Sequence, residues 1–92
     1  MRKIDKLENA TVVLHGVGNP DFRQFSDVSP RQIVPVSSLK EARTKCLEYI
    51  EEWDLGFGNW GGGQVKVGKK KVAYVSYNGR VWDPTEKEEL SE

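Results

Sequence analysis

Residues 55–64, LGFGNWGGGQ, contain the spacing Gly-x-Gly-x-x-Gly, which occurs in loops that bind dinucleotides. In those loops the glycines follow a strand and open a helix, whose N-terminus holds the pyrophosphate. Here a helical pattern precedes the glycines and a β-rich pattern follows them, so a phosphate would face the negative end of a helix. We therefore expect no nucleotide and no other cofactor at this loop.

A structural role explains these glycines better. Gly56 lies where a helix commonly ends on a left-handed residue, after which Phe57 can fold back onto the last turn. Residues 61–63 have no side chains, so another backbone or a large ring can approach them closely. Trp60 is the natural ring, and we expect it to be either a core residue beneath the helix or an exposed interface anchor.

Nucleophilic catalysis would need His15 and Cys46, the only histidine and the only cysteine of the 92 residues. Cys46 falls on the apolar stripe of a predicted helix, where a free cysteine behaves as a small hydrophobic residue. A reactive cysteine is instead partly exposed in an electropositive setting. A metal site would need clustered histidine, cysteine or carboxylate ligands, and the sequence has no such cluster. We expect a protein that is not an enzyme and binds no metal.

Basic and aromatic residues gather on two predicted hairpins. The basic ones are Lys69, Lys70 and Lys71 at one hairpin tip and Arg80 on the next hairpin. The aromatic ones are Tyr74, Tyr77 and Trp82 on adjacent strands. Together they resemble the stacking platform and basic rim of a single-stranded nucleic-acid binder, although such aromatics more often pack across strands. The 14 basic and 14 acidic residues give a net charge of +0, which lacks the usual electrostatic footprint of a nucleic-acid binder.

Carboxylates crowd the end of the predicted helix, where they oppose the helix dipole by roughly 0.3–1 kcal/mol each. They are Glu48, Glu51, Glu52 and Asp54. Lysines of a neighbouring strand, Lys66 and residues 69–71, can compensate them in a solvated arrangement. The alternative is that this acidic end serves a basic partner.

The clearest element is a helix over about residues 39–54. Ser38 and Glu41 form the S-x-x-E capping box that opens a helix. Apolar residues then recur at helical spacing on one face. They are Leu39, Ala42, Cys46, Leu47, Ile50 and Trp53.

The β-rich segments predict four strands, at residues 10–14, 32–36, 64–67 and 72–77. Pro35 marks the second as an edge strand or a strand end. The Asn-Gly pair at 78–79 predicts a tight type I′ hairpin. Its cross-strand pairs would be Tyr77 with Arg80 and Val75 with Trp82. The predicted fold class is α+β, an antiparallel sheet of about four strands with one long amphipathic helix packed on one face.

Two segments lack clear periodicity. Residues 16–31 are predicted to form a long loop, pinned to the core by Phe22 and Phe25, and loops of this length are usually functional or mobile. The acidic tail, residues 84–92, is expected to fray. We predict a single domain over residues 1–92 with its core at about 10–83. The lone cysteine and the lack of an apolar run long enough to span a membrane favour the cytoplasm.

The motifs GNWGGGQV and VSYNGRVWD resemble a pattern in small, mostly uncharacterised proteins of phages and mobile elements in proteobacteria. In those proteins a helix opens after S-L-x-E-A, ends in L-G-x-G-N-W-x-G-G and is followed by a V-S-Y-N-G-R-V-W hairpin. The matching residues here are 38–42, 55–63 and 75–82. The resemblance covers about residues 10–83 and brings no catalytic motif. In size and small α+β architecture the chain is also similar to phage anti-CRISPR proteins, which bind a host nucleoprotein, often on surfaces that hold crRNA or target DNA.

The resemblance implies a non-enzymatic, phage-encoded protein in the cytoplasm of the infected bacterial host. It would inhibit a CRISPR surveillance complex by occupying a nucleic-acid-binding surface. The residues expected to contact this partner are Arg23, Arg31, Trp60, Lys69, Lys70, Lys71, Tyr77 and Arg80. One alternative is a single-stranded nucleic-acid-binding module that uses Tyr74, Tyr77 and Trp82. Another is a structural or assembly protein that associates through its sheet edge.

Overall fold

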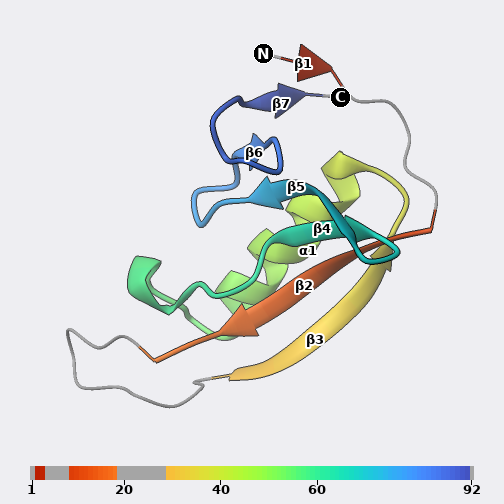
Figure 1. The fold of residues 1–92 in the computed structure, drawn as a ribbon. Helices are drawn as coiled ribbons and strands as arrows, with labels where there is room; N and C mark the ends of the chain where they lie inside the picture. Colours follow the sequence, from red (N-terminus) through yellow and green to blue (C-terminus); the bar gives the residue numbers. More distant parts are fainter. Residues whose placement is uncertain (1, 4–8, 19–28, 92) are drawn as a thin grey trace.

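The computed structural model describes residues 2–3, 9–18 and 29–91. These residues form an antiparallel sheet of five strands with one α-helix packed against one face, which confirms the predicted α+β class (Figure 1). The strands lie in the spatial order β3 (Ser29–Val36), β2 (Ala10–Gly16), β4 (Gln64–Val67), β5 (Lys70–Val75) and β6 (Val81–Trp82). Two short strands, β1 (Arg2–Lys3) and β7 (Leu90–Ser91), pair in parallel beside β6.

Side-chain alternation turns one apolar face of the sheet toward helix α1 (Leu39–Glu52). The core residues of the five-stranded sheet are Val36 on β3, Ala10, Val12 and Leu14 on β2, Val65 on β4, Ala73 and Val75 on β5, and Val81 on β6. The buried helix residues are Leu39, Ala42, Cys46 and Tyr49. These two sets interdigitate into one core between the helix and the sheet.

Cys46 is fully buried on α1, as the apolar spacing predicts, and burial raises the pKa of its thiol to about 12. The predicted stripe is wrong at its end, where Tyr49 is buried and Trp53 is 39% exposed. Tyr49 can enter the core because its hydroxyl donates to Ser29 Oγ at 2.8 Å. Tyr49 is therefore part of the core face of α1, although a search for apolar residues at helical spacing does not include it because of its hydroxyl group.

The start of α1 follows the predicted capping box closely. The Ser38 hydroxyl accepts a hydrogen bond from the Glu41 amide at 3.0 Å. The Glu41 carboxylate reaches one residue further back and accepts from the Ser37 amide at 2.6 Å. Two amides at the helix start are thereby satisfied.

The end of α1 differs from the prediction. Asp54, with a φ of 50°, is the left-handed residue, whereas Gly56 is extended with a φ of −89° and a ψ of 172°. The Leu55 amide donates to the Ile50 carbonyl at 3.0 Å. The Asp54 amide donates to the Glu51 carbonyl at 3.2 Å, which completes a Schellman motif. Burial of Leu55 requires the chain to turn before it, so the helix cannot run on to the glycine.

Asp54→Gly is therefore expected to raise the free energy of unfolding by about 1 kcal/mol, because glycine adopts the left-handed conformation without Cβ strain. Loss of a carboxylate at the helix C-terminus acts in the same direction. In Gly56→Ala the new Cβ would lie 3.4 Å from Asn59 Oδ1, in an extended backbone. That change is expected to stay within about 0.5 kcal/mol. Urea unfolding checks both, and a destabilised Asp54→Gly would contradict this account of the helix end.

Residues 61–63 continue the line of β4 between β2 and β5. The Gly63 amide donates to the Val13 carbonyl at 2.7 Å, and the Gly63 carbonyl accepts from the Val75 amide at 2.8 Å. A Cβ on Gly62 would lie 2.5 Å from the Val13 oxygen. The prediction that glycine here admits a second backbone at close range is confirmed.

The connection between β5 and β6 is longer than predicted. The cross-strand pairs are Tyr74 with Trp82 and Val75 with Val81, so the predicted pairs are wrong. The Ser76 amide donates to the Arg80 carbonyl at 2.9 Å, which closes a three-residue loop that contains Tyr77. Gly79 has a φ of 85° and Asn78 does not enter the left-handed region. This is a type I turn followed by a left-handed glycine, because a type I′ turn would need both residues left-handed.

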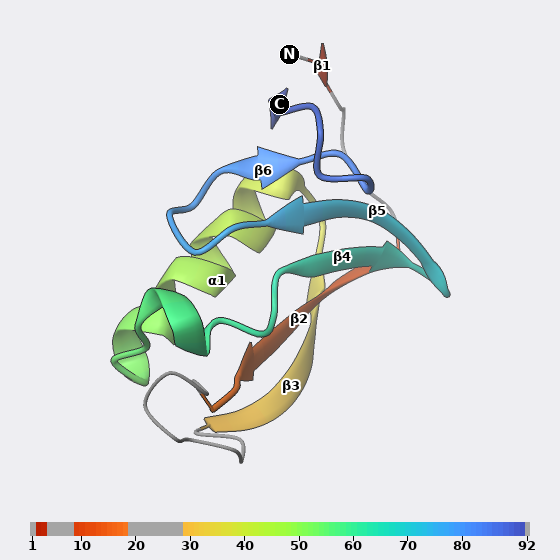
Figure 2. The same cartoon turned by 60° about the vertical axis from the view of Figure 1, so that its left-hand side comes forward.

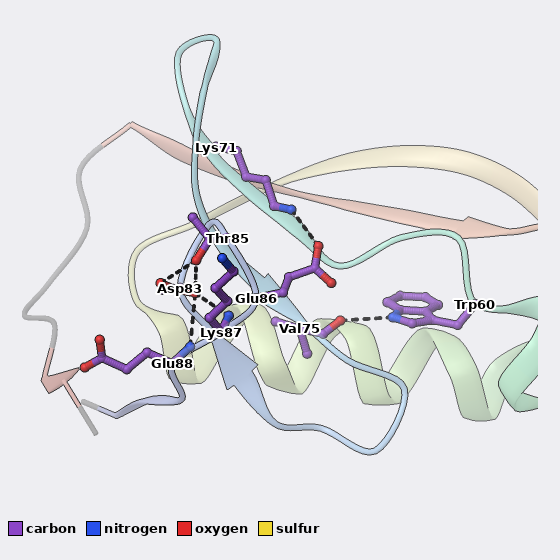
Figure 3. Close-up of polar contacts among 8 residues, drawn as sticks. All are labelled: Trp60, Lys71, Val75, Asp83, Thr85, Glu86, Lys87 and Glu88. Carbon is purple, nitrogen blue, oxygen red and sulfur yellow. Dashed lines mark hydrogen bonds and ion pairs between the residues drawn. The ribbon is translucent and has the colours of Figure 1, made fainter.

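The C-terminal segment belongs to the fold, so the prediction that residues 84–92 fray is wrong for its described part. Asp83 Oδ1 accepts from the amides of Lys87 and Glu88 at 2.8 and 3.3 Å, which curls the chain back (Figure 3). Leu90 is then only 4% exposed and belongs to the core. The Asp-Pro pair signals a turn, but local patterns do not show that the chain returns to the sheet.

Candidate functional site

Five aromatic side chains converge on a groove of about 410 Å³ on the β5–β6 side of the sheet. They are Phe57, Trp60, Tyr74, Tyr77 and Trp82, and Ser76 and Glu86 complete the lining. This feature is named the aromatic groove below. Its residues come from the glycine-rich segment, from the β5–β6 hairpin and from the C-terminal segment, so distant parts of the chain build one surface.

Strand alternation places Tyr74 and Trp82 on the sheet face that points away from α1. The two residues are cross-strand partners, and their neighbours Ala73, Val75 and Val81 are buried in the core. Figures 1 and 2 show α1 on one side of the sheet only. The two rings therefore form the floor of the groove on the side that the helix leaves uncovered.

Trp60 belongs to the core and to the groove. Its indole Nε1 donates to the Val75 carbonyl at 3.0 Å (Figure 3). Its ring centroid lies 6.2 Å from that of Tyr49 on α1. The predicted core packing is thus confirmed, and the part of the ring that stays exposed lines the groove.

Phe57 and Tyr77 form the end of the groove nearest the C-terminus of α1. Their rings meet edge to face with centroids 6.0 Å apart, and the Tyr77 hydroxyl donates to the Leu55 carbonyl at 3.0 Å. Phe57 begins the short 3-10 helix η2 (Phe57–Asn59) and is 82% exposed. The prediction that Phe57 folds back on the last helical turn is wrong, because the helix ends at Glu52 and the chain has already turned at Asp54.

A β-bulge aims Lys71 at the groove. The pairing register of β4 with β5 shifts here and leaves Val72 as an extra residue on β5. Val72 packs against the core, so Lys71 lies on the same face as Tyr74. The Lys71 ammonium lies 5.3 Å from the Tyr74 ring centroid. It also lies 3.1 Å from Glu86 Oε2 (Figure 3).

Burial raises the pKa of the Tyr74 phenol above the ordinary value, and the Glu86 carboxylate raises this pKa further. Burial disfavours a charge of either sign, whereas the carboxylate disfavours a negative charge and favours a positive one. The ring faces also attract a positive charge.

The other basic residues predicted on the hairpins do not reach the groove. Lys69 and Lys70 are exposed at the turn that joins β4 to β5. Arg80 is exposed beyond the other end of β5, about 20 Å away along the strand. The lysine tip and Arg80 therefore form no common patch.

The predicted contacts of the long loop are also separate from the groove. Arg31 is exposed on β3, at the opposite edge of the sheet, and Arg23 lies outside the described residues, as do Phe22 and Phe25. The position of β3 confirms that Pro35 marks an edge strand. Pro30 and Pro35 lack amide donors and blunt this edge against pairing with another strand. Of the eight predicted contact residues, the groove and its rim unite Trp60, Lys71 and Tyr77.

The predicted compensation of the acidic helix end by hairpin lysines is wrong. Ala10 pairs with Val36, just before α1, and with Val67, just before the lysine turn. The lysines therefore lie near the start of α1, about 20 Å from its acidic end. The exposed carboxylates there are Glu48, Glu51, Glu52 and Asp54. The last turn of α1 has no basic residue, and Asp54 stands three residues before Phe57 in the chain.

Sequence patterns miss three members of the groove, Phe57, Ser76 and Glu86. Phe57 follows Gly56, whose type suggests a helix cap. This local signal predicts that Phe57 folds back onto the helix, and so the exposed position of Phe57 is missed. Glu86 lies in a polar segment without periodicity. The available signal is Asp83-Pro84 followed by Thr85, residue types that fold a chain back on itself through side-chain hydrogen bonds.

Comparison of the chain with models of protein families, with curated proteins and with solved structures finds no match. In the described part of the chain, no helix is long and apolar enough to cross a membrane. The same residues contain no group of three or more histidine, cysteine or acidic side chains placed to hold a metal ion. The structure defines a small α+β domain with an aromatic groove whose lining includes one carboxylate.

Proposed function

We propose that this chain is a non-enzymatic, phage-encoded protein that inhibits a host CRISPR surveillance complex by occupying one of its nucleic-acid-binding surfaces. Its partner is a host protein or ribonucleoprotein, and it acts in the cytoplasm of the infected bacterium. The aromatic groove carries the proposal, because binding hot spots are enriched in tryptophan and tyrosine. The resemblance of its central motifs to phage proteins supplies the class of partner.

Two properties of the surface support a binding role. Phe57 is 82% exposed at the end of the groove, so packing within the fold does not require an aromatic residue at this position. Contiguous exposed aromatic surface is typical of interaction sites. The acidic end of α1 beside it complements a protein surface that normally holds phosphates, and such complementarity steers association.

A phage-plating assay tests the proposal on a host with active CRISPR immunity. Expression of the wild-type chain is expected to restore plaques of a targeted phage. Phe57→Ala is expected to weaken this protection while leaving the fold intact, because the side chain contributes little to the core. Ile33→Ala is the matched control, since Ile33 is 56% exposed on β3 at the other edge of the sheet. If the wild-type chain protects no phage in any host with an active system, the proposal is wrong.

The cross-strand pair of Tyr74 and Trp82 favours a second function, single-stranded nucleic-acid binding. Salt separates the two functions, because phosphate contacts lose affinity steeply with salt and a protein interface loses less. Charge reversal at Lys69 and Lys70 gives a second criterion. These lysines lie at the β4–β5 turn, outside the groove, so the change is expected to weaken nucleic-acid binding and to leave binding of a protein partner in the groove unchanged. Pull-down from host lysate with and without nuclease identifies which partner is retained.

A further inference from the structure

The aromatic groove has the chemistry of a site for a positively charged group. Its walls are the faces and edges of five aromatic rings, and the charged residue in its lining is Glu86. Aromatic faces carry a negative quadrupole that attracts ammonium and guanidinium groups. A carboxylate at the edge of such a cage adds a partner for the same cation.

Lys71 shows that the groove accepts a cation. Its ammonium lies over the Tyr74 ring, 5.3 Å from the centroid, and 3.1 Å from Glu86 Oε2. The bulge at Val72 is what turns this lysine toward the groove. The pair is open to solvent, with the Lys71 side chain 29% and the Glu86 side chain 50% exposed, so the contact can be exchanged for another.

Acidic residues also stand near the Phe57 end of the groove. Tyr77, at that end, donates to the carbonyl of Leu55, three residues after the last residue of α1. Glu51, Glu52 and Asp54 are all exposed there. A basic ligand that enters the groove would meet these carboxylates, whereas a phosphate would be repelled by them.

We propose that the aromatic groove receives an arginine or lysine side chain from a basic segment of a partner protein, and that Lys71 holds this place in the free protein. The proposal rests on the proposed function and names the chemistry by which the partner is recognised. Arginine suits the site best, because its planar guanidinium stacks on rings and meets a carboxylate with two hydrogen bonds. The incoming cation displaces the Lys71 ammonium from Tyr74 and Glu86.

The test uses Lys71→Met, because removal of this ammonium is expected to strengthen the binding of a cationic ligand and not to strengthen the binding of a nucleic acid. A tetra-arginine peptide is titrated into the protein carrying Trp53→Phe, so that the tryptophan fluorescence comes from Trp60 and Trp82 in the groove and reports binding there. Lys71→Met is expected to strengthen peptide binding about three-fold or more, since the competing ammonium is gone. Phe57→Ala is expected to weaken it by a similar factor, and Ile33→Ala to leave it unchanged. Thermal melts confirm that each variant is folded.

Two parallel titrations define the outcomes. A tetra-glutamate peptide is expected not to bind, and an oligothymidylate is expected to bind no better to Lys71→Met than to the wild type. Weaker peptide binding by Lys71→Met, no saturable peptide binding, or tight oligothymidylate binding that Lys71→Met abolishes would each overturn the cation site. The same variants in the plating assay keep the two proposals apart. Protection without peptide binding removes the cation site alone, and peptide binding as expected without protection removes the inhibitor function alone.

Discussion

Gly63→Ala is expected to lower the free energy of unfolding by about 3 kcal/mol or more, because two costs coincide at this position. Gly63 has a φ of 101°, a conformation that side-chain-bearing residues rarely adopt. A Cβ built there would fall on the Val75 carbonyl oxygen, which belongs to the strand paired with this segment. Relief of the clash would have to separate residues 61–63 from β5. Urea unfolding followed by circular dichroism measures the effect.

Gly68→Ala is the matched control for this prediction. Gly68 also has a positive φ, of 63°, but a Cβ there would meet nothing within 4 Å. Its substitution is expected to cost only about 1–2 kcal/mol, the strain of the left-handed backbone alone. If the two variants lose the same stability, the contact with Val75 is not the cause of the loss, and close backbone approach is not what requires glycine at position 63.

Leu90→Ala is expected to lower the free energy of unfolding by about 2–5 kcal/mol, as other buried leucines do when a cavity replaces them. Leu90 is 4% exposed and belongs to the core cluster, although only two residues follow it in the chain. Truncation after Pro84 should cost at least as much, because it removes this side chain and the loop that Asp83 organises. Thermal melts and urea unfolding check both variants.

Glu88→Ala serves as the control in the same segment. Glu88 is exposed, and its contact with Asp83 is made by the backbone amide, which alanine retains. The change should stay within about 0.5 kcal/mol. A truncated chain that melts like the full-length one would show that the C-terminal segment adds nothing to the core, and Leu90 would then have to be regarded as surface.

Much of the fold could be predicted because its signals are local. The capping pair Ser38 and Glu41 and the apolar spacing after it mark α1, and β-rich runs mark four of the five strands of the sheet. The exact register could not be predicted in the same way. The extra residue Val72 and the three-residue loop closed by Ser76 and Arg80 each shift a pairing by one position. Such register shifts depend on which side chains must face the core, and this is determined by tertiary packing.

The candidate site could be predicted in part. Tyr74, Tyr77 and Trp82 were expected to share a surface, and all three line the groove. Phe57 and Glu86 join them only because the helix ends early and the C-terminal segment folds back, and both are tertiary events. Lys71 reads in the sequence as one of three equivalent lysines. The β-bulge at Val72 distinguishes it from the other two lysines, and no local sequence pattern predicts that bulge.

The parallel pairing of β1 with β7 joins the two ends of the described chain, which lie close together in both ribbon views. Arg2 and Leu90 are the most widely separated strand partners of the described chain, so their pairing closes its longest loop and has the largest entropic cost of closure among these strand pairs. Strands β1 and β7 have two residues each, so their few hydrogen bonds offset little of this entropic cost. We therefore expect this pair to form after the five-stranded sheet has assembled. At equilibrium we expect the amides of this pair to exchange with solvent before those of β2 and β4, because short strands with few hydrogen bonds open at low free-energy cost.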